Sequence, residues 1–414
     1  MRLLSFSVEN YKSFYERQSV TFIENEQNAT AFYGANSAGK SNLFSALKFY
    51  CDFILHSTDF HRNAVLGNNY FQYVKNGAME PSSFSAEFKN QGTQFRYSFS
   101  INRIGKVSSE KLEFASIKLL KNELKYETVF SRKSMVNNNR YIEHGFGSAL
   151  LNETRPDSLV LTRAYAANNK IAKRVFECIE SINLYNFNSF GMTAEKVANN
   201  SELKGNVLRF LKMADLYIQD FHVEEIKTSY GGDSLENILS KEVADLYRRA
   251  LYKVSTVHYV YDENDWSSDV CSSDLYDEND VVVGTRDMML NENESNGTKQ
   301  LFEYAYPVIE ALNEGKVLYI DELETNLHPR ECAFIVELFN NIAGENKQKG
   351  QLIINTHDMT LMDLLGKDNV YLLGKNRHEA TVISKISGVR SDDKNLAKKY
   401  YAGLFGATPR IMGY

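Results

Sequence analysis

Eight residues decide the fold of this chain: Gly34-Ala35-Asn36-Ser37-Ala38-Gly39-Lys40-Ser41, a complete G-x-x-x-x-G-K-S motif. Small residues let successive backbone N–H groups close around anionic oxygens, and Lys40 can reach the β- and γ-phosphates of a nucleotide. The Ser41 hydroxyl is an oxygen ligand of the kind that Mg²⁺ accepts. We therefore expect this stretch, called the phosphate loop below, to bind a nucleoside triphosphate, using Gly34, Asn36, Gly39, Lys40, Ser41 and the adjacent Asn42.

The segments on either side of the phosphate loop support this prediction. The apolar stretch 29–33 predicts a buried strand, and residues 42–54 predict a helix. One face of that helix is apolar and carries Leu43, Leu47, Cys51 and Ile54. The loop then lies at a helix N-terminus, where the partial positive charge of the helix dipole attracts a phosphate.

The composition is that of a globular protein, and it excludes several classes of function. The chain has 414 residues, is 43% hydrophobic and carries a net charge of −6, so its overall charge gives no case for nucleic-acid binding. No stretch approaches the ~20 apolar residues of a membrane span, and the first residues lack the pattern of a signal peptide. We expect a cytoplasmic protein without disulfides or a zinc site, because its cysteines are widely spaced: Cys51, Cys178, Cys271 and Cys332.

A second strand carries the acids that a phosphate-loop enzyme needs. The apolar stretch 317–320 runs directly into Asp321-Glu322. Asp321 is placed to hold Mg²⁺, directly or through water, and Glu322 is placed to orient or deprotonate the attacking water. A further buried strand, 351–355, is followed by His357, which can hydrogen-bond the γ-phosphate or that water.

One further turn can bind an anion. Ser295-Asn296-Gly297 precedes an apolar helix over 301–312, and a Ser/Gly turn at a helix N-terminus is a possible second phosphate site. Taken alone, the same three residues are an ordinary helix N-cap, and the sequence leaves both interpretations open.

The predicted elements divide the chain into an α/β ATPase with a helical insertion. Residues 1–165 hold the phosphate loop and an antiparallel β meander, in which apolar side chains alternate along 84–88 and 95–101. Residues 166–260 show helical stripes and are expected to form the insertion. Residues 276–414 return to alternating strands and helices, which predicts a parallel sheet shared with the phosphate-loop strand.

Residues 261–275 have a different character. The pentapeptide Tyr-Asp-Glu-Asn-Asp occurs at 261–265 and again at 276–280, and the decamer between the copies contains the only tryptophan of the chain, Trp266. A direct repeat around a foreign-looking decamer is typical of a sequence-assembly fault or of translated adapter DNA, whereas a genuine loop is the alternative. We exclude the segment from the prediction of the fold.

The order of these motifs resembles that of ABC-type ATPase heads, the ATPases of SMC, RecF-like and OLD-type proteins. The chain is most similar to the stand-alone prokaryotic AAA-type or ABC-like ATPases of abortive-infection and anti-phage loci. The similarity extends over most of the chain and includes three segments that flank the motifs: Ser5–Phe14, Asp321–Pro329 and Tyr401–Pro409.

The resemblance implies a role for each motif residue. Lys40 and Ser41 would bind phosphate and Mg²⁺, Asp321 would support the metal, and Glu322 would be the general base. His357 would sense the γ-phosphate and Lys12 would approach the nucleotide base. Ser295 and Gly297 would cap the nucleotide of a second copy, so that two chains sandwich two ATP molecules head to tail.

The chain also departs from its relatives. Glu324 stands where transporter-type heads usually carry aspartate, which puts signalling across the dimer in doubt. No glutamine is a convincing metal-binding lobe residue, since Gln91 and Gln94 fall in a predicted hairpin. No nuclease segment of the OLD type follows residue 366.

Two functions fit this sequence. In the first, the chain is the sensor ATPase of a defence system and gates a separately encoded nuclease or toxin. In the second, it is a RecF-like ATPase of DNA maintenance that clamps DNA directly. The negative net charge and the absence of a basic stripe favour the first function. DNA binding stays a possibility, and no membrane partner is expected.

Overall fold

The structure is a computed structural model of the chain. It describes residues 1–22, 27–58, 68–75, 77, 79–118, 123–134, 140–142, 150, 153–186, 192–214, 218–225, 252–258, 274–276, 278–279, 281–285, 288–340, 349–386 and 395–408. The helical stripe expected over 238–251 and nearly all of the suspect segment 261–275 lie outside these residues. Only Asp274 and Leu275 of that segment are described, at the start of the short strand β12 (Asp274–Tyr276).

A largely parallel sheet holds the phosphate loop. The order of its described strands is β18-β17-β3-β16-β15-β9, and all neighbours are parallel except the β17–β18 hairpin. Strands β3, β16 and β15 are buried along their whole length, as expected for a sheet covered on both faces. Their bounds are β3 Ala29–Tyr33, β9 Ile182–Tyr185, β15 Val317–Ile320, β16 Gln351–Asn355, β17 Val370–Lys375 and β18 Thr381–Lys385.

A second sheet is antiparallel and has one apolar face. Its order is β2-β1-β4-β5-β6-β7-β8. The predicted meander forms its centre, where Phe84 pairs with Phe99 and Ala86 with Tyr97. The turn at Gln91-Gly92 has positive φ at both residues, as a two-residue hairpin requires. The bounds are β1 Arg2–Glu9, β2 Gln18–Thr21, β4 Ser82–Asn90, β5 Thr93–Ile101, β6 Val107–Lys118, β7 Glu123–Ser134 and β8 Arg140–Ile142.

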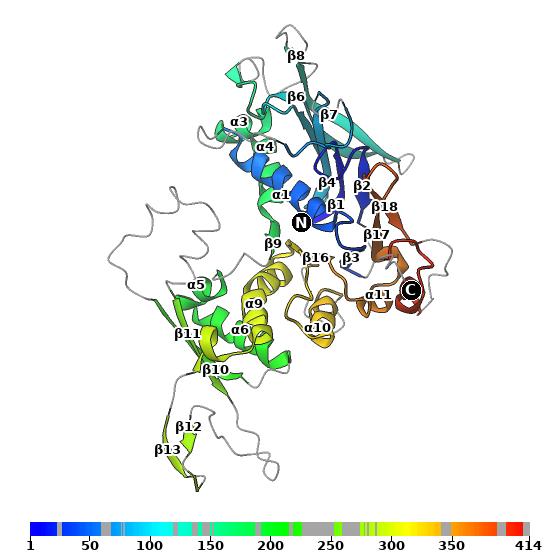
Figure 1. The fold of residues 1–414 in the computed structure, drawn as a ribbon. Helices are drawn as coiled ribbons and strands as arrows, with labels where there is room; N and C mark the ends of the chain where they lie inside the picture. Colours follow the sequence, from blue (N-terminus) through cyan, green and yellow to red (C-terminus); the bar gives the residue numbers. More distant parts are fainter. Residues whose placement is uncertain are drawn as a thin grey trace.

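Helix α1 (Lys40–His56) lies between the two sheets (Figure 1). Its apolar side chains share one core with the antiparallel sheet, with α3 (Val160–Ala166) and α4 (Lys170–Glu180), and with one face of the parallel sheet. Phe32 of β3 and Tyr319 of β15 reach into this core. The predicted helix of residues 42–54 therefore lies in the core between the two sheets.

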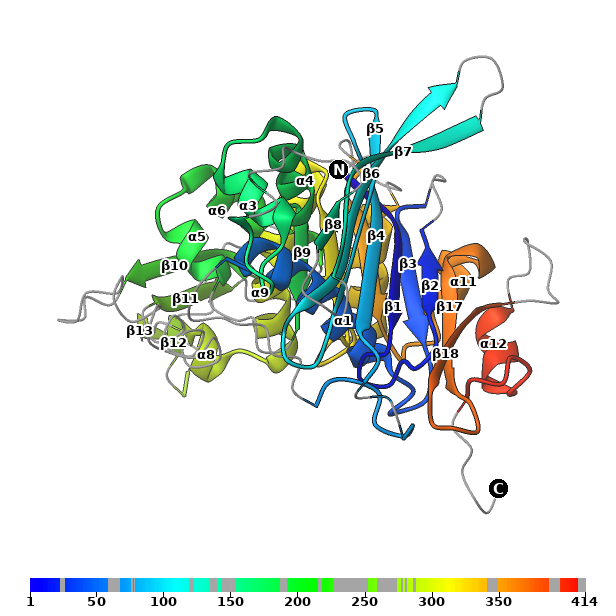
Figure 2. The same cartoon turned by 90° about the horizontal axis from the view of Figure 1, so that it is seen from above.

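The opposite face of the parallel sheet is covered by C-terminal helices, and Figure 2 shows α11 and α12 at the edge formed by β17 and β18. The second core contains Ala31 and Tyr33 of β3 and the inner sides of these helices. The helices involved are α6 Ser201–Met213, α9 Asn296–Glu314, α10 Pro329–Phe339, α11 Leu361–Leu365 and α12 Leu396–Tyr401.

The region 166–260 contains more β structure than its helical stripes indicate. Helix α4 and strand β9 join the first core and the parallel sheet, whereas α5 (Met192–Ala198) and α6 pack on α9. A small antiparallel sheet follows, formed by β10 (Ile218–Glu225), β11 (Tyr252–His258) and β14 (Met288–Met289). The hairpin of β12 with β13 (Val282–Thr285) projects beyond this sheet in Figure 1.

These observations confirm the predicted fold class. A phosphate loop joins a strand and a helix of a largely parallel α/β sheet, and an antiparallel subdomain packs on that helix. The C-terminal helices, together with α5 and α6 of the insertion, cover the far face. In the part of the chain that the structure describes, no helix is both long enough and apolar enough to cross a membrane.

Candidate functional site

The phosphate loop needs its glycines for steric reasons. Gly39 has φ +112°, and a Cβ atom there would collide with the side chain of Thr381. A Cβ atom on Gly34 would lie 2.5 Å from the carbonyl oxygen of Leu373. Ser37 also adopts a left-handed conformation, with φ +67°. The loop is thus fixed in shape against β17 and β18.

Lys40 holds the phosphate loop closed in this structure. Only 6% of the residue is exposed, and its Nζ donates to the carbonyl oxygens of Gly34 at 2.9 Å and Ala35 at 3.4 Å. The same Nζ lies 2.9 Å from Nε2 of His357. Burial lowers the pKa of Lys40, and the carboxylates of Glu324, Glu322 and Asp321 oppose that shift. Three carboxylates therefore act on a single ammonium group.

The expected metal residues meet across the sheet. The Ser41 hydroxyl lies 3.3 Å from Oδ1 of Asp321, although 280 positions separate them in the sequence. They meet because β3 and β15 both flank β16, so that the carboxyl ends of these strands share one edge of the sheet. A serine hydroxyl and a carboxylate are the oxygen ligands that a hard divalent cation prefers.

A buried relay holds Asp321 in place and was not predicted from the sequence. The amide Nδ2 of Asn355 donates to Oδ1 of Asp321 at 2.6 Å, and the hydroxyl of Tyr319 donates to Oδ1 of Asn355 at 2.9 Å. Asn355 is completely buried at the end of β16. The sequence did contain one signal for this relay, the amide of Asn355 at the end of an otherwise apolar strand. A buried polar group of this kind needs hydrogen-bond partners.

Glu322 stands in a strained backbone conformation. Its φ is +58°, which is uncommon for a residue with a side chain and is often found at functional sites. The neighbouring Leu323 is fully buried and donates its N–H to the carbonyl of Asn355, so the turn is firmly held. Glu322 itself is exposed, and its charge acts on both Lys40 and His357. Its carboxylate is thus available at the mouth of the site.

Glu324 fixes the position of His357. Its Oε1 accepts the backbone N–H of His357 at 2.7 Å, whereas its Oε2 is buried without a hydrogen-bond partner among the described residues. Burial and then the charge of Lys40 lower the pKa of His357, and Glu324 and Glu322 partly oppose the shift. The imidazole is therefore neutral near pH 7, and its Nε2 can accept a hydrogen bond from Lys40.

Two residues that are predicted to contact the nucleotide make structural contacts in this structure. Asn42 donates through Nδ2 to the Ser13 hydroxyl at 2.8 Å, which also lies 2.8 Å from Oγ1 of Thr381. This contact ties the start of α1 to the N-terminal segment and β18. Lys12 has φ +49° and donates its backbone N–H to Asn69. Burial lowers the pKa of the Lys12 ammonium group, which lies 5.8 Å from the ring centre of Tyr11.

The Ser295-Asn296-Gly297 turn caps α9. The Ser295 hydroxyl accepts the N–H of Thr298 at 3.0 Å, which is the ordinary N-cap contact. A Cβ atom on Gly297 would lie 3.0 Å from the carbonyl oxygen of Asn326, in the loop that follows the acids. Ser295 and Asn296 are exposed, so the end of this helix remains open to a second molecule.

The residues present fit Mg²⁺ bound together with a nucleotide. No group of three or more His, Cys, Asp or Glu side chains that could hold a metal occurs within the described residues. Ser41 and Asp321 supply two oxygen ligands, and Mg²⁺ usually takes one or two carboxylates with waters and substrate phosphates.

Comparison with known proteins agrees with this geometry. Residues 29–363 match the family model described as "AAA domain, putative AbiEii toxin, Type IV TA system". The match includes the phosphate loop, the Asp-Glu pair and His357. The chain belongs to this AAA family. Membership confirms the expected relationship to ABC-like ATPases.

Solved structures with a similar arrangement include two SMC head domains. The SMC head domain from Thermotoga maritima is 14% identical in sequence, with a TM-score of 0.41. The match covers 94% of this chain and 100% of that chain. An SMC head bound to the C-terminal winged-helix domain of ScpA is 11% identical with a TM-score of 0.45, covering 94% and 98%. No curated protein matches this chain.

Proposed function

We propose that this chain is an ATP-hydrolysing switch that works as a head-to-tail dimer and regulates a separately encoded effector of an anti-phage defence system. One observation carries the ATPase assignment. The phosphate loop, the acid of β15 and the histidine after β16 converge on one site, with Lys40 against His357 and Ser41 against Asp321. This is the set of groups that phosphoryl transfer to water requires.

The contacts of Lys40 indicate how the site responds to ATP. In the structure its ammonium group bonds to two loop carbonyls and to His357. The β- and γ-phosphates would take over these hydrogen bonds, because a charged acceptor binds an ammonium group more strongly than a carbonyl does. His357 would then be free to bond the γ-phosphate. Nucleotide binding would thus be coupled to the position of the loop that Glu324 holds.

Hydrolysis needs a base and a support for developing charge. Glu322 would accept a proton from the attacking water, since its carboxylate is exposed beside Asp321. Asn355 and Tyr319 would keep Asp321 oriented toward Ser41. Mg²⁺, when bound at Ser41 and Asp321, would neutralise charge on the phosphate oxygens.

The proposed dimer is supported by the predicted second anion site. The N-terminus of α9 presents the exposed Ser295 and Asn296, and helix N-termini attract phosphate. A second copy placed head to tail would bring this turn to the nucleotide on the first. The assembly would close with ATP and open after hydrolysis, because the γ-phosphate is the group shared by the two copies.

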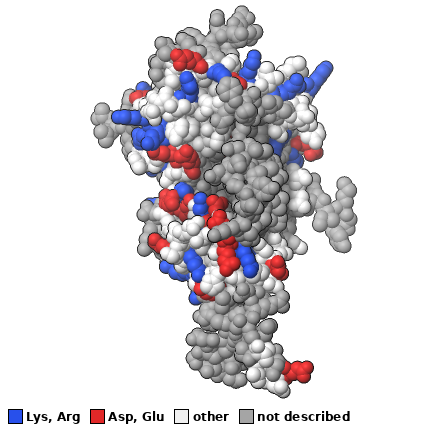
Figure 3. Space-filling view, turned by 90° about the vertical axis from the view of Figure 1, so that its left-hand side faces the viewer, with Lys and Arg blue, Asp and Glu red and all other residues white. Residues whose placement is uncertain are grey.

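Two observations favour a protein effector over DNA as the direct partner. The matched family is described as an AAA domain and putative AbiEii toxin of a type IV toxin–antitoxin system, which supports a toxin–antitoxin setting over DNA maintenance. On the face shown in Figure 3, the described acidic and basic residues are interspersed and form no continuous basic stripe. Backbone binding to DNA relies on such a stripe. RecF-like clamping of DNA is the second candidate.

A variant that binds ATP but does not hydrolyse it tests the proposed function. Glu322→Gln should bind ATP and Mg²⁺ normally, lose hydrolysis, and form a stable dimer with ATP in light scattering after size exclusion. The wild type with ADP, and Glu322→Gln without nucleotide, should stay monomeric. A Glu322→Gln protein that hydrolyses ATP at the wild-type rate would show that the base is a different residue.

The choice of partner is tested with the wild-type protein. Duplex DNA that stimulates ATP turnover, with a steep loss of stimulation between low and moderate salt, would support the DNA clamp. Turnover that DNA does not change, but that a protein encoded next to this chain does change, would support the defence regulator.

A further inference from the structure

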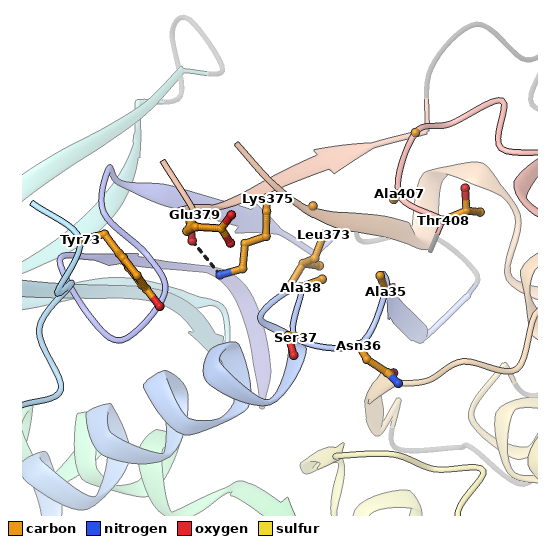
Figure 4. A pocket seen from close by; sticks show the side chains of 12 residues that line it. Ala35, Asn36, Ser37, Ala38, Tyr73, Leu373, Lys375, Glu379, Ala407 and Thr408 are labelled. Atoms are coloured by element: carbon orange, nitrogen blue, oxygen red, sulfur yellow. Dashed lines mark hydrogen bonds between the residues drawn. The ribbon is translucent and has the colours of Figure 1, made fainter. Parts of the chain in front are cut away.

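The antiparallel sheet packs one face on α1, and a cavity of about 550 Å³ opens on its other face. This cavity crosses five neighbouring strands, β2, β1, β4, β5 and β6. It is larger than the cavity of about 370 Å³ that lies against the phosphate loop and is shown in Figure 4. None of the described residues that line the larger cavity is assigned to nucleotide binding or hydrolysis. The cavity is therefore separate from the proposed ATPase site.

The floor of this cavity is a row of serines. Strand pairing places Ser7 of β1 opposite Ser19 of β2 on one side and opposite Ser85 of β4 on the other. Ser85 is in turn paired with Ser98 of β5. Strand propensity favours β-branched and aromatic side chains, so it does not explain four serines side by side. These four residues are called the serine floor below.

The serine floor contains a buried hydroxyl group that lacks a partner. Ser85 is only 8% exposed and lines the cavity, and its hydroxyl makes no hydrogen bond within the part of the chain that the structure describes. Buried hydroxyl groups normally have a hydrogen-bond partner. A polar group that enters the cavity would supply one.

One wall of the cavity is charged but internally neutralised. The Arg96 guanidinium group bonds to Oε1 of Glu87 at 2.5 Å and lies 3.6 Å from Oε2 of Glu113. The Lys111 ammonium group also pairs with Glu113, at 2.6 Å. These ion pairs hold the long side chains of the wall upright beside the serine floor, and they leave little net charge there.

The opposite wall carries charges that are not paired with each other. Arg17 and Glu9 both line the cavity, but Arg17 Nη2 donates to the Ser7 hydroxyl at 3.0 Å and forms no ion pair with a described carboxylate. A guanidinium group binds a carboxylate more strongly than it binds a hydroxyl. Arg17 is therefore available for a carboxylate from a ligand.

The dimensions of the cavity suit an α-helix. Each wall lies two residues along the strands from the serine floor, so the walls are ~13 Å apart, and a helix is ~10–12 Å across. Five strands at a spacing of ~4.8 Å give a length of ~19 Å, which corresponds to about 13 helical residues.

We propose that this cavity docks a polar α-helix of the separately encoded effector, with a carboxylate of that helix bonded to Arg17. The inference rests on the proposed function, because it names the surface that the effector contacts. The docked face of the helix must be polar, since the serine floor offers hydroxyl groups rather than apolar side chains.

Two other occupants fit the cavity less well. A second copy of this chain would place one concave surface against another in a two-fold contact, and the two surfaces would not fill each other. A nucleic acid would meet three carboxylates and two guanidinium groups, and this balance does not favour a phosphate backbone.

Two variants of the full chain test the proposal, and the probe is the protein encoded next to this chain. Ser98→Arg fills the serine floor, whereas Arg17→Glu reverses the charge that the helix would meet. Gln91→Arg and Arg103→Glu are the matched controls, because both positions are exposed in turns of the same sheet and do not line the cavity. Calorimetry measures the affinity of each protein for the probe. ATP turnover without the probe and thermal unfolding check that each variant folds.

Both test variants should bind the probe at least tenfold more weakly than the wild type, whereas both controls should stay within twofold. Arg17→Lys keeps the charge and should lose less affinity than Arg17→Glu. Test variants that bind the probe as tightly as the controls would overturn the proposal. Variants that instead lose stimulation of ATP turnover by duplex DNA would also overturn it, in favour of a nucleic acid in the cavity. A wild type that does not bind the probe would refute the proposed regulation of an effector, and this docking role with it.

Discussion

The phosphate loop and the Ser295-Asn296-Gly297 turn both lie at helix N-termini, yet their surroundings differ. Side chains that follow the ends of β15 and β16 contact the phosphate loop, and Lys40 and Ser41 have partners more than 250 positions away. The turn bonds within its own helix, where the Ser295 hydroxyl accepts the N–H of Thr298 and the Ser295 carbonyl accepts the N–H of Lys299. A helix N-terminus attracts an anion in both places. Under the proposed function, the first site binds a nucleotide within one chain, whereas the second acts on the nucleotide of a partner, and the predictions below test this difference.

The largest effect is expected at the phosphate loop. Lys40→Ala removes the ammonium group that faces the phosphates, and we expect ATP affinity to fall about 100-fold, because a charged hydrogen bond is worth ~1.5–3 kcal/mol. Calorimetric titration with ATP and Mg²⁺ measures it. The control is Lys48→Ala in the same helix, whose exposed ion pair with Asp52 faces solvent. Equal affinities for the Lys40 and Lys48 variants would refute the assignment of the loop.

The second effect is expected at the turn and appears only in the dimer. Asn296→Glu places a negative charge in the first turn of α9, which favours the helix but repels the triphosphate of a partner. In the Glu322→Gln background we expect ATP-dependent dimerisation to weaken at least tenfold, with monomer ATP affinity within twofold. Sedimentation velocity measures the dimer, and Asn296→Gln is the neutral control. Normal dimerisation of Asn296→Glu would leave the turn as a simple N-cap.

The third effect concerns the relay behind Asp321. Asn355→Ala leaves Asp321 Oδ1 without its buried donor, and we expect kcat to fall about tenfold while ATP affinity changes less. Tyr319→Phe removes only the far hydrogen bond of the relay and should cost less than Asn355→Ala. Steady-state phosphate release at saturating ATP measures both variants, and thermal unfolding checks that they fold. A larger loss in Tyr319→Phe would contradict the proposed order of the relay.

The sequence predicts those parts of the site that are marked by a local sequence pattern. The phosphate loop, the Asp-Glu pair and His357 each follow an apolar strand, and the shared edge of a parallel sheet brings strand ends together. The relay was missed because its partners lie on different strands. Nothing local distinguishes Asn355 from a polar residue that simply ends a strand, and only the pairing of β15 with β16 places it at Asp321.

The fold shows the same division between local and distant information. Alternation predicted the β4–β5 hairpin, because one face of that sheet is buried and the other is polar. The strand β9 was assigned to a helical region, since its four residues follow the helical stripe of α4 without a change in hydrophobicity. Its strand character comes from parallel pairing with β15, more than 130 residues later. Tertiary contacts therefore determine the conformation of that segment.

The smallest expected effect is a change in the pKa of His357, whose side chain contacts Lys40. Because the charge of Lys40 helps to lower the pKa of His357, Lys40→Met should raise that pKa toward its ordinary value of about 6.5. Protonation of His357 is disfavoured in the folded chain, so its contribution to stability is full above pH 6.5 and falls as the pH drops below it. Imidazole NMR titration of the nucleotide-free protein measures the change, with Lys48→Met as control. A Lys40→Met protein with an unchanged His357 titration would show that burial alone sets the pKa, and that the 2.9 Å contact does not couple the phosphate loop to the histidine.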